Sequence, residues 1–249
     1  MLRKGRCAVI VLMKKRTAAV ICGAFILIAA AVCFLAFHQD KPAASLDRIP
    51  AQAAVLILDA GHGGEDGGAV SASGIPESRI NLSIAQKTQI LLTFLGQEAI
   101  MTREGEEAIY SPDAQTLREK KVSDLSNRVK LVNETAGSTL ISIHQNSLPG
   151  SKAHGAQVFY NAADTARQIA VSVQQALNSS VNQGGEKHPR QIDDSIYLMK
   201  NIRCPGILVE CGFLSNAAEA ELLQTDDHQR RLSAAIVSGY LQSRTESSQ

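Results

Sequence analysis

Three short apolar segments of this chain each lead to a side chain that can bind a metal ion or take part in catalysis. They are residues 55–59, 139–143 and 206–210, which lead to or end in His62, His144 and Glu210 respectively. Segments of this length, rich in Val, Ile and Leu, predict buried strands. Because the carboxyl ends of parallel strands meet at one edge of a sheet, we expect the three side chains to lie near one another.

The segments between these strands complete an alternating pattern of strands and helices. Further strands are predicted over 98–101, 155–160 and 196–199, and helices over 76–94, 122–135, 165–181, 216–223 and 228–241. Residues 182–194 are polar and predict a loop, and Ser123 is the expected N-cap of its helix. The chain is therefore predicted to have an α/β fold, with a twisted, mostly parallel or mixed sheet flanked by helices, in a single catalytic domain over 55–245.

Residues 1–54 differ in composition from the rest of the chain. Lys and Arg residues gather in 1–17, whereas 18–37 contains no charged residue and, as a helix, would rise roughly 30 Å, the thickness of a bilayer core. This pattern predicts a basic cytoplasmic segment, one transmembrane anchor and a catalytic domain outside the cell membrane. A cleaved signal peptide, and so a secreted protein, is the alternative. Residues 38–54, with prolines and small polar residues, are expected to form a tether.

The charge of the chain is nearly balanced, with 25 Lys and Arg residues against 24 Asp and Glu residues. Outside the N-terminal segment the basic residues form no long stripe, so no nucleic-acid partner is expected. Only Cys204 and Cys211 follow the apolar N-terminal segment. An extended strand would separate them by roughly 23 Å, which is beyond disulfide reach, so both are predicted to be free thiols.

A metal centre is predicted where the strands end. His62 and His144 supply imidazoles, and carboxylates come from Glu210 and, at the start of a helix, from Glu77. Two imidazoles and one carboxylate, with one open position, are the usual ligands of a hydrolytic zinc site, where bound water has a pKa of roughly 7. Each residue alone has an ordinary structural role, and it is their convergence that favours the site. The glycine-rich loop around His62 matches neither a P-loop nor a dinucleotide-binding motif, so phosphate binding is not expected.

Three polar residues near these ligands are expected to support them. Asp59 and Asp66 are candidates to accept the outer N–H of a histidine ligand or to fix the glycine-rich loop. Asn146, which follows His144 closely in the sequence, is a candidate for the same kind of support.

In this order, the motifs resemble the type 3 family of zinc-dependent N-acetylmuramoyl-L-alanine amidases. The matching segments are 59–69, Glu77, 142–146 and 209–216, within a resemblance that spans about 55–241. Ala60 stands where the family pattern usually has Pro, a difference that changes the stiffness of the loop and no ligand. The resemblance implies one zinc ion per chain, bound by His62, Glu77 and His144.

The resemblance also implies the reaction and its substrate. The reaction is hydrolysis of the amide between N-acetylmuramic acid and the first L-alanine of the stem peptide in peptidoglycan, with Glu210 as the catalytic carboxylate. Arg190, in the polar segment 182–194, is a candidate contact for the stem peptide. A zinc peptidase or deacetylase acting on peptidoglycan would share the ligand set, and a non-catalytic wall-binding module would share the crevice. Both remain alternatives.

Two further segments resemble the germination-specific amidases of endospore formers. They are 120–129 and 194–200, and the predicted membrane anchor and the lack of wall-binding repeats agree with them. This resemblance implies a role in making the muramic δ-lactam of the spore cortex, and so in sporulation and germination. A partner lipoprotein that aids metal binding, or a dimer, would leave no pattern in the sequence.

Overall fold

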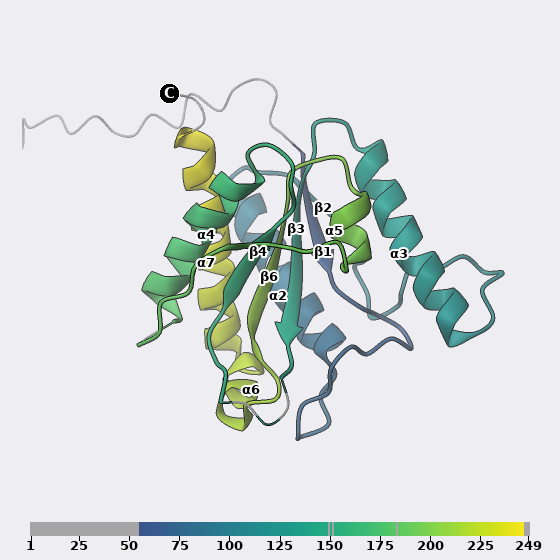
Figure 1. The fold of residues 1–249 in the computed structure, drawn as a ribbon, viewed down its shortest axis with the longest axis horizontal. Helices are drawn as coiled ribbons and strands as arrows, with labels where there is room; N and C mark the ends of the chain where they lie inside the picture. Colours follow the sequence, from purple (N-terminus) through teal and green to yellow (C-terminus); the bar gives the residue numbers. More distant parts are fainter. Residues whose placement is uncertain (1–54, 149, 151, 183, 247–249) are drawn as a thin grey trace, which may run out of the picture. The chain divides into compact units, whose positions relative to one another are not determined.

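A six-stranded sheet with the strand order β2-β1-β3-β6-β4-β5 forms the centre of the fold (Figure 1). The structure is a computed structural model that describes residues 55–148, 150, 152–182 and 184–246. The strands are β1 (Leu56–Ala60), β2 (Ala99–Met101), β3 (Thr139–Asn146), β4 (Gln157–Tyr160), β5 (Arg190–Gln191) and β6 (Gly206–Phe213). All neighbouring strands pair in parallel except β4 and β6, which are antiparallel. The predicted mixed, mostly parallel α/β sheet is confirmed.

Helices cover both faces of this sheet (Figure 1). They are α2 (Glu77–Phe94), α3 (Leu117–Glu134), α4 (Ala166–Ser180), α5 (Tyr197–Asn201), α6 (Ala217–Leu223) and α7 (Asp226–Glu246). Side chains of α2, α4 and α7 bury one face of the central strands, and side chains of α3 and α5 bury part of the other. Burial on both faces explains why the central strands have nearly continuous apolar sequences.

Side chains alternate between the two faces of the sheet along each strand, and this alternation decides which of them lie together at the carboxyl ends of β3 and β6. Leu140 and Leu208 pack with α3 and α5 on one face of the sheet. Two positions further along each strand, the same face carries Ser142 and Glu210, because successive side chains alternate between faces. His144 lies directly beside Glu210 in the β3–β6 register. The face that begins as packed core therefore ends in polar side chains.

The strand predicted over 196–199 is wrong, because Tyr197–Asn201 forms the short helix α5. Leu198 and Met199 of this helix are buried in the smaller apolar cluster beside α3. A short apolar segment has too few residues for its periodicity to distinguish strand from helix. The predicted loop over 182–194 also contains the two-residue strand β5.

The helix predicted over 122–135 begins earlier than expected, at Leu117. Thr116 is its N-cap and forms a capping box with Glu119. Ser123 lies inside the helix instead, and its hydroxyl accepts a hydrogen bond from the Ser111 backbone N–H at 2.9 Å. The capping signal of Thr116 therefore decides the start of this helix, although charged residues follow it.

Strands β3 and β6 continue beyond their predicted ends, so that His144, predicted to follow its strand, and Glu210, predicted to end its strand, both lie inside strands. Cys204 and Cys211 are both free thiols, as predicted. The predicted cytoplasmic segment 1–17, anchor 18–37 and tether 38–54 lie outside the described residues. Among the helices that the structure describes, none combines the length and apolar character needed to span a bilayer.

Candidate metal centre

His62, Glu77 and His144 converge at the carboxyl edge of the sheet, as the sequence predicted. His62 lies in the loop after β1, Glu77 is the first residue of α2, and His144 belongs to β3. One ligand atom from each residue lies within 4.8 Å of the other two, so the group could hold a metal ion. His62 Nε2 is 3.4 Å from Glu77 Oε2, and His144 Nδ1 is 3.0 Å from Glu77 Oε1. The two imidazole side chains are about one-fifth exposed, so solvent or a substrate can reach the centre.

Two glycines leave the space in which these ligands meet. A Cβ added to Gly61 would lie 2.2 Å from the His144 ring, and one added to Gly68 would lie 2.6 Å from Glu77 Oε2. His62 itself has a φ of 62°, a left-handed conformation that costs a non-glycine residue roughly 1–2 kcal/mol. Other contacts must therefore hold the loop in this shape.

Arg128 and Arg103 hold the loop through its backbone carbonyls. Arg128 is buried and donates to the carbonyl oxygens of Ala60 at 2.8 Å and of His62 at 2.7 Å. Arg103, also buried, donates to the Ala60 carbonyl at 2.9 Å and the Gly61 carbonyl at 3.2 Å. Neither arginine was predicted to belong to the site, since side-chain bonds to a distant backbone leave no pattern in the sequence.

Asp59 fixes the loop by holding Arg128. Its carboxylate accepts from Arg128 at 2.6 Å, from Ser142 at 2.6 Å and from Thr102 at 2.8 Å. Burial alone would raise the pKa of Asp59, but the guanidinium of Arg128 and the other donors outweigh it and lower the pKa to about 2. Of the two roles predicted for Asp59, these bonds correspond to fixing the loop.

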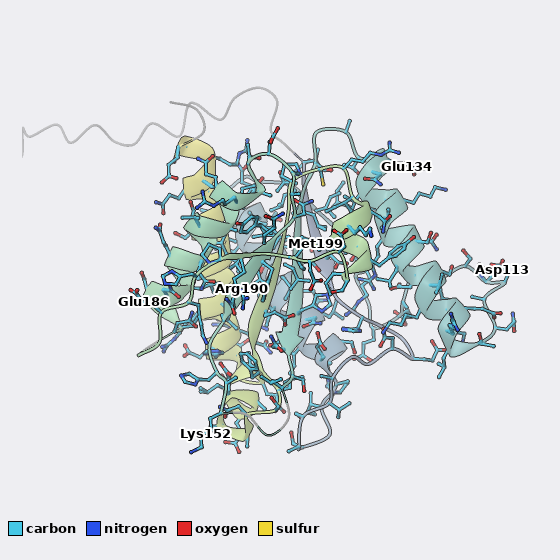
Figure 2. All side chains as sticks on the ribbon, in the orientation of Figure 1. Asp113, Glu134, Lys152, Glu186, Arg190 and Met199 are labelled. Carbon is cyan, nitrogen blue, oxygen red and sulfur yellow. The ribbon has the colours of Figure 1, made fainter. Side chains whose placement is uncertain are left out.

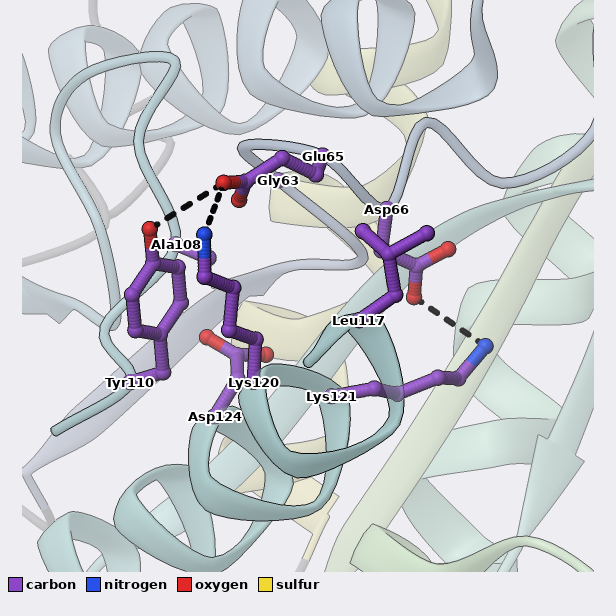
Figure 3. Close-up of a pocket in the computed structure, with 9 residues that line it drawn as sticks. All are labelled: Gly63, Glu65, Asp66, Ala108, Tyr110, Leu117, Lys120, Lys121 and Asp124. Carbon is purple, nitrogen blue, oxygen red and sulfur yellow. Dashed lines mark hydrogen bonds and ion pairs between the residues drawn. The ribbon is translucent and has the colours of Figure 1, made fainter. Parts of the chain in front are cut away.

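Asp66 contacts the outer nitrogen of His62. His62 Nδ1 lies 3.0 Å from Asp66 Oδ2, and Lys121 donates to the same oxygen at 3.1 Å. A bond from Nδ1–H to a carboxylate leaves Nε2 facing Glu77 and, once Nε2 has lost its proton, free to bind a metal, the arrangement common to metal-binding histidines. Figure 3 shows the Asp66–Lys121 pair, together with the neighbouring contacts of Lys120 and Tyr110 with Glu65, around a cavity of about 150 Å³.

Glu77 is held as a charged carboxylate. Its oxygens accept backbone N–H bonds from Ala69 and Gln145, both at 3.0 Å, and a side-chain bond from Asn81 at 3.2 Å. Burial would raise its pKa, but the hydrogen bonds and charges of His144 and His62 hold the pKa well below the usual range. Asn81 was not predicted, although its position four residues after Glu77 on the same helix places the two side chains together.

Glu210 has the opposite environment. Burial raises its pKa to about 7; the charge of Glu77 adds to the rise, and His144 and His62 oppose it. Among the described residues, its buried Oε2 has no hydrogen-bond partner. A carboxyl with a pKa near neutrality is suited to accept and return a proton.

The donor atoms of the centre can be compared with those that a zinc ion binds. Two imidazole nitrogens and a charged carboxylate are donors that zinc accepts, and the buried Oε2 of Glu210 has no protein partner among the described residues to compete for a proton. The residues therefore fit zinc.

Asn146 and Arg190 have less direct relations to this centre. The backbone carbonyl of Asn146 accepts from Leu214 at 2.8 Å, and support of His144 by its side chain stays a prediction. Arg190, on β5, is exposed and lines a cavity of about 470 Å³ that Glu210 also lines.

The fold and the centre together define an α/β protein with a candidate metal site of the hydrolytic kind. The model of the family Amidase_3, described as N-acetylmuramoyl-L-alanine amidase, matches residues 56–242, and the chain belongs to this family. The predicted family is confirmed, and with it the enzyme class: the chain is an N-acetylmuramoyl-L-alanine amidase acting on peptidoglycan.

Three similar proteins support this assignment. The germination-specific N-acetylmuramoyl-L-alanine amidase of Bacillus subtilis (strain 168) is 36% identical over 199 residues, covering 80% of this chain and 83% of its own length. The CwlD amidase from Clostridioides difficile, solved in complex with the GerS lipoprotein, is 34% identical with a TM-score of 0.74, covering 78% of this chain and 100% of that chain. The catalytic domain of CwlV from Bacillus (Paenibacillus) polymyxa var. colistinus is 25% identical with a TM-score of 0.66, covering 78% of this chain and 99% of that chain.

Proposed function

We propose that this chain is a zinc-dependent amidase in which His62, Glu77 and His144 bind the metal and Glu210 moves the proton. The observation that carries the proposal is the contrast between the carboxyls of Glu77, which stays charged, and Glu210, whose pKa is about 7. When bound, zinc supplies Lewis acidity that polarises a carbonyl and acidifies water. Asp66 holds His62 in the tautomer that binds metal.

Glu210 has two tasks in this reaction. It accepts a proton from the attacking water and then gives that proton to the nitrogen of L-alanine as the amide C–N bond breaks. The products are the free carboxylate of N-acetylmuramic acid and a stem peptide with a new amino terminus. The location of Glu210 beside His144 in the β3–β6 register supports this role.

Mass spectrometry of peptidoglycan incubated with the zinc-loaded protein tests this reaction. We expect release of intact stem peptides that begin with L-alanine. Trimmed peptides would indicate a peptidase and free acetate a deacetylase, and either result would overturn the proposal. The Glu210→Gln variant is the matched control, because it keeps the size of the side chain and removes its acid–base chemistry.

We also propose that the substrate is the peptidoglycan of the spore cortex, where cleavage leads to the muramic δ-lactam. The similarity to the germination-specific amidase of Bacillus subtilis supports this. Expression of the chain in a B. subtilis strain that lacks that amidase should restore muramic δ-lactam, measured by chromatography of digested cortex. Cleavage of stem peptides in the wall of vegetative cells, with no lactam in the spore cortex, would contradict the cortex role.

The proposed site of action is the outer side of the cell membrane, with residues 18–37 as an uncleaved anchor. The uncharged run and the preceding basic residues support this. Fractionation of expressing cells should find the full-length protein in membranes and resistant to alkaline carbonate. A shortened protein in the medium would indicate signal-peptide cleavage instead.

A lipoprotein partner is proposed on the ground that the C. difficile amidase was solved with one.

A further inference from the structure

Strand pairing places Arg190 on the same face of the sheet as Glu210. Phe159 of β4 pairs with Leu208 of β6, and Arg190 of β5 pairs with Phe159. Paired residues of neighbouring strands project from the same face, and Leu208 and Glu210 are two positions apart on β6. The four side chains therefore share the face on which the candidate metal centre opens.

A cavity of about 470 Å³ joins these residues. Its floor includes the apolar side chains of Phe159 and Leu208, Glu210 lines it, and residues 190–193, 195 and 196 complete its wall. Two strand spacings and two residues along the strand put the Cα atoms of Arg190 and Glu210 about 12 Å apart. An extended peptide of three or four residues spans about that distance.

The cavity is lined by both negatively and positively charged side chains. Glu210 stands beside the metal centre, and Arg190 is exposed and, among the described residues, has no side-chain ion pair or hydrogen bond (Figure 2 labels it). The carboxylate of Asp193 accepts bonds from the backbone N–H and the hydroxyl of Ser195 and so is already occupied. An anionic group in this cavity is therefore attracted to Arg190 and repelled by Glu210 and Asp193.

We propose that this cavity binds the peptide side of the scissile amide, with Arg190 forming an ion pair with a peptide carboxylate one or two residues beyond L-alanine. The proposal rests on the amidase function proposed above. An apolar floor with one free guanidinium fits an extended acidic peptide, whereas a neutral glycan gives Arg190 no opposite charge. The chain thus selects stem peptides whose carboxylates are free over those in which they are amidated.

Two forms of one peptidoglycan preparation test the proposal. In one the stem-peptide carboxylates are free, and in the other they have been converted to carboxamides with carbodiimide and ammonia. The wild-type protein should release peptides about 10- to 100-fold faster, as kcat/KM, from the free form, the range expected for one charge-assisted hydrogen bond. Arg190→Gln should lose this preference by slowing only on the free form. Arg190→Lys should restore part of it, because the charge is kept and the two-pronged geometry is lost.

Arg230→Gln is the matched control, because Arg230 is an exposed cation of α7 paired with Asp226 and lies outside this cavity. It should keep the wild-type preference. Equal loss of rate on both substrates in Arg190→Gln, or unchanged preference in that variant, would overturn the subsite. So would a wild-type protein that cleaves both forms equally. If the wild-type protein releases no stem peptide from either form, the amidase function itself fails, which separates the two conclusions.

Discussion

At the scale of single residues, two glutamates near the same centre are given different chemistry by their surroundings. Glu77 receives two backbone N–H bonds and stays ionised, which suits a metal ligand. Glu210 is buried, its Oε2 lacks a partner among the described residues, and its pKa lies at about 7. Hydrogen bonding to one carboxylate and desolvation of the other therefore suit Glu77 and Glu210 to the proposed roles of ligand and base.

Replacing Glu210 by Gln should lower kcat by about 10²- to 10⁴-fold, because the amide cannot accept the proton of water. The zinc content, measured by elemental analysis after dialysis, should equal that of the wild type. A variant that loses zinc along with activity would indicate that Glu210 is a ligand and not the base.

Replacing His62 or His144 by Ala should remove the metal as well as the activity. Each change deletes one of the three donors that lie within 4.8 Å of one another. Full zinc occupancy in the His62→Ala variant would contradict the proposed ligand set.

Zinc binding should release about one proton at pH 7.5. Burial would lower the pKa of His62, but its contacts with Asp66 and Glu77 raise it to about 9 in the metal-free protein. His62 is therefore protonated below pH 9 and must lose that proton to bind metal, so the apparent zinc affinity rises with pH up to about 9 and levels off above it. Calorimetry in two buffers of different ionisation enthalpy measures the released protons. Asp66→Asn should reduce the release, because the pKa of His62 then falls towards 6.5.

At the scale of elements, helix α3 holds the loop that carries His62, a residue with left-handed φ, in its shape. Arg128 crosses from this helix to the carbonyls of Ala60 and His62 and to the carboxylate of Asp59. Both members of the Arg128–Asp59 pair are 1% exposed, so solvent does not screen the interaction. Loss of one partner would leave the other charge buried.

Arg128→Met should lower the free energy of unfolding by about 3–5 kcal/mol, since Asp59 would remain buried without its guanidinium. Urea denaturation measures the change. Lys130→Gln on the same helix is the control and should change stability by less than about 0.5 kcal/mol, because Lys130 is exposed and its pair with Glu134 spans 4.0 Å. A similar small effect for Arg128→Met would show that the pair contributes little.

The strands and the residues that converge at the candidate centre could be predicted from the sequence, whereas the network of side chains that supports them could not. Buried parallel strands have continuous apolar sequences, and His62, His144 and Glu210 follow or end such segments, whereas Glu77 begins helix α2. Arg103 and Arg128 instead bond to backbone carbonyls about 42–68 residues away in sequence, and any residue type offers a carbonyl. Helix α5, with five residues, is too short for its pattern to distinguish it from a strand.

At the scale of the whole molecule, the centre joins segments that are far apart in the sequence. His62 and Glu77 come from the first strand–helix unit of the described domain, and His144 from the central strand β3. A metal bound by all three stabilises the folded state only, because the unfolded chain does not keep the ligands together.

Zinc at about 1,000 times its dissociation constant should therefore stabilise the protein by about 4 kcal/mol, which for a domain of this size is on the order of 10 °C in Tm. Thermal unfolding with zinc and after removal by a chelator measures the shift. His144→Ala should unfold at one temperature under both conditions. A wild-type Tm that is the same with zinc and after chelation would contradict a structural link between the metal and the fold.

The face of the sheet that opens at Glu210 has a consequence for how the enzyme meets its polymer. Helices α3 and α5 pack against part of that face, and beyond Leu208 the cavity lined by Glu210 replaces the packed core. A centre at an open surface does not require the end of a glycan chain of the peptidoglycan to enter a tunnel in the protein. Cleavage can then begin at interior positions of a cross-linked mesh, and the enzyme can leave after each cut without travelling to a chain end.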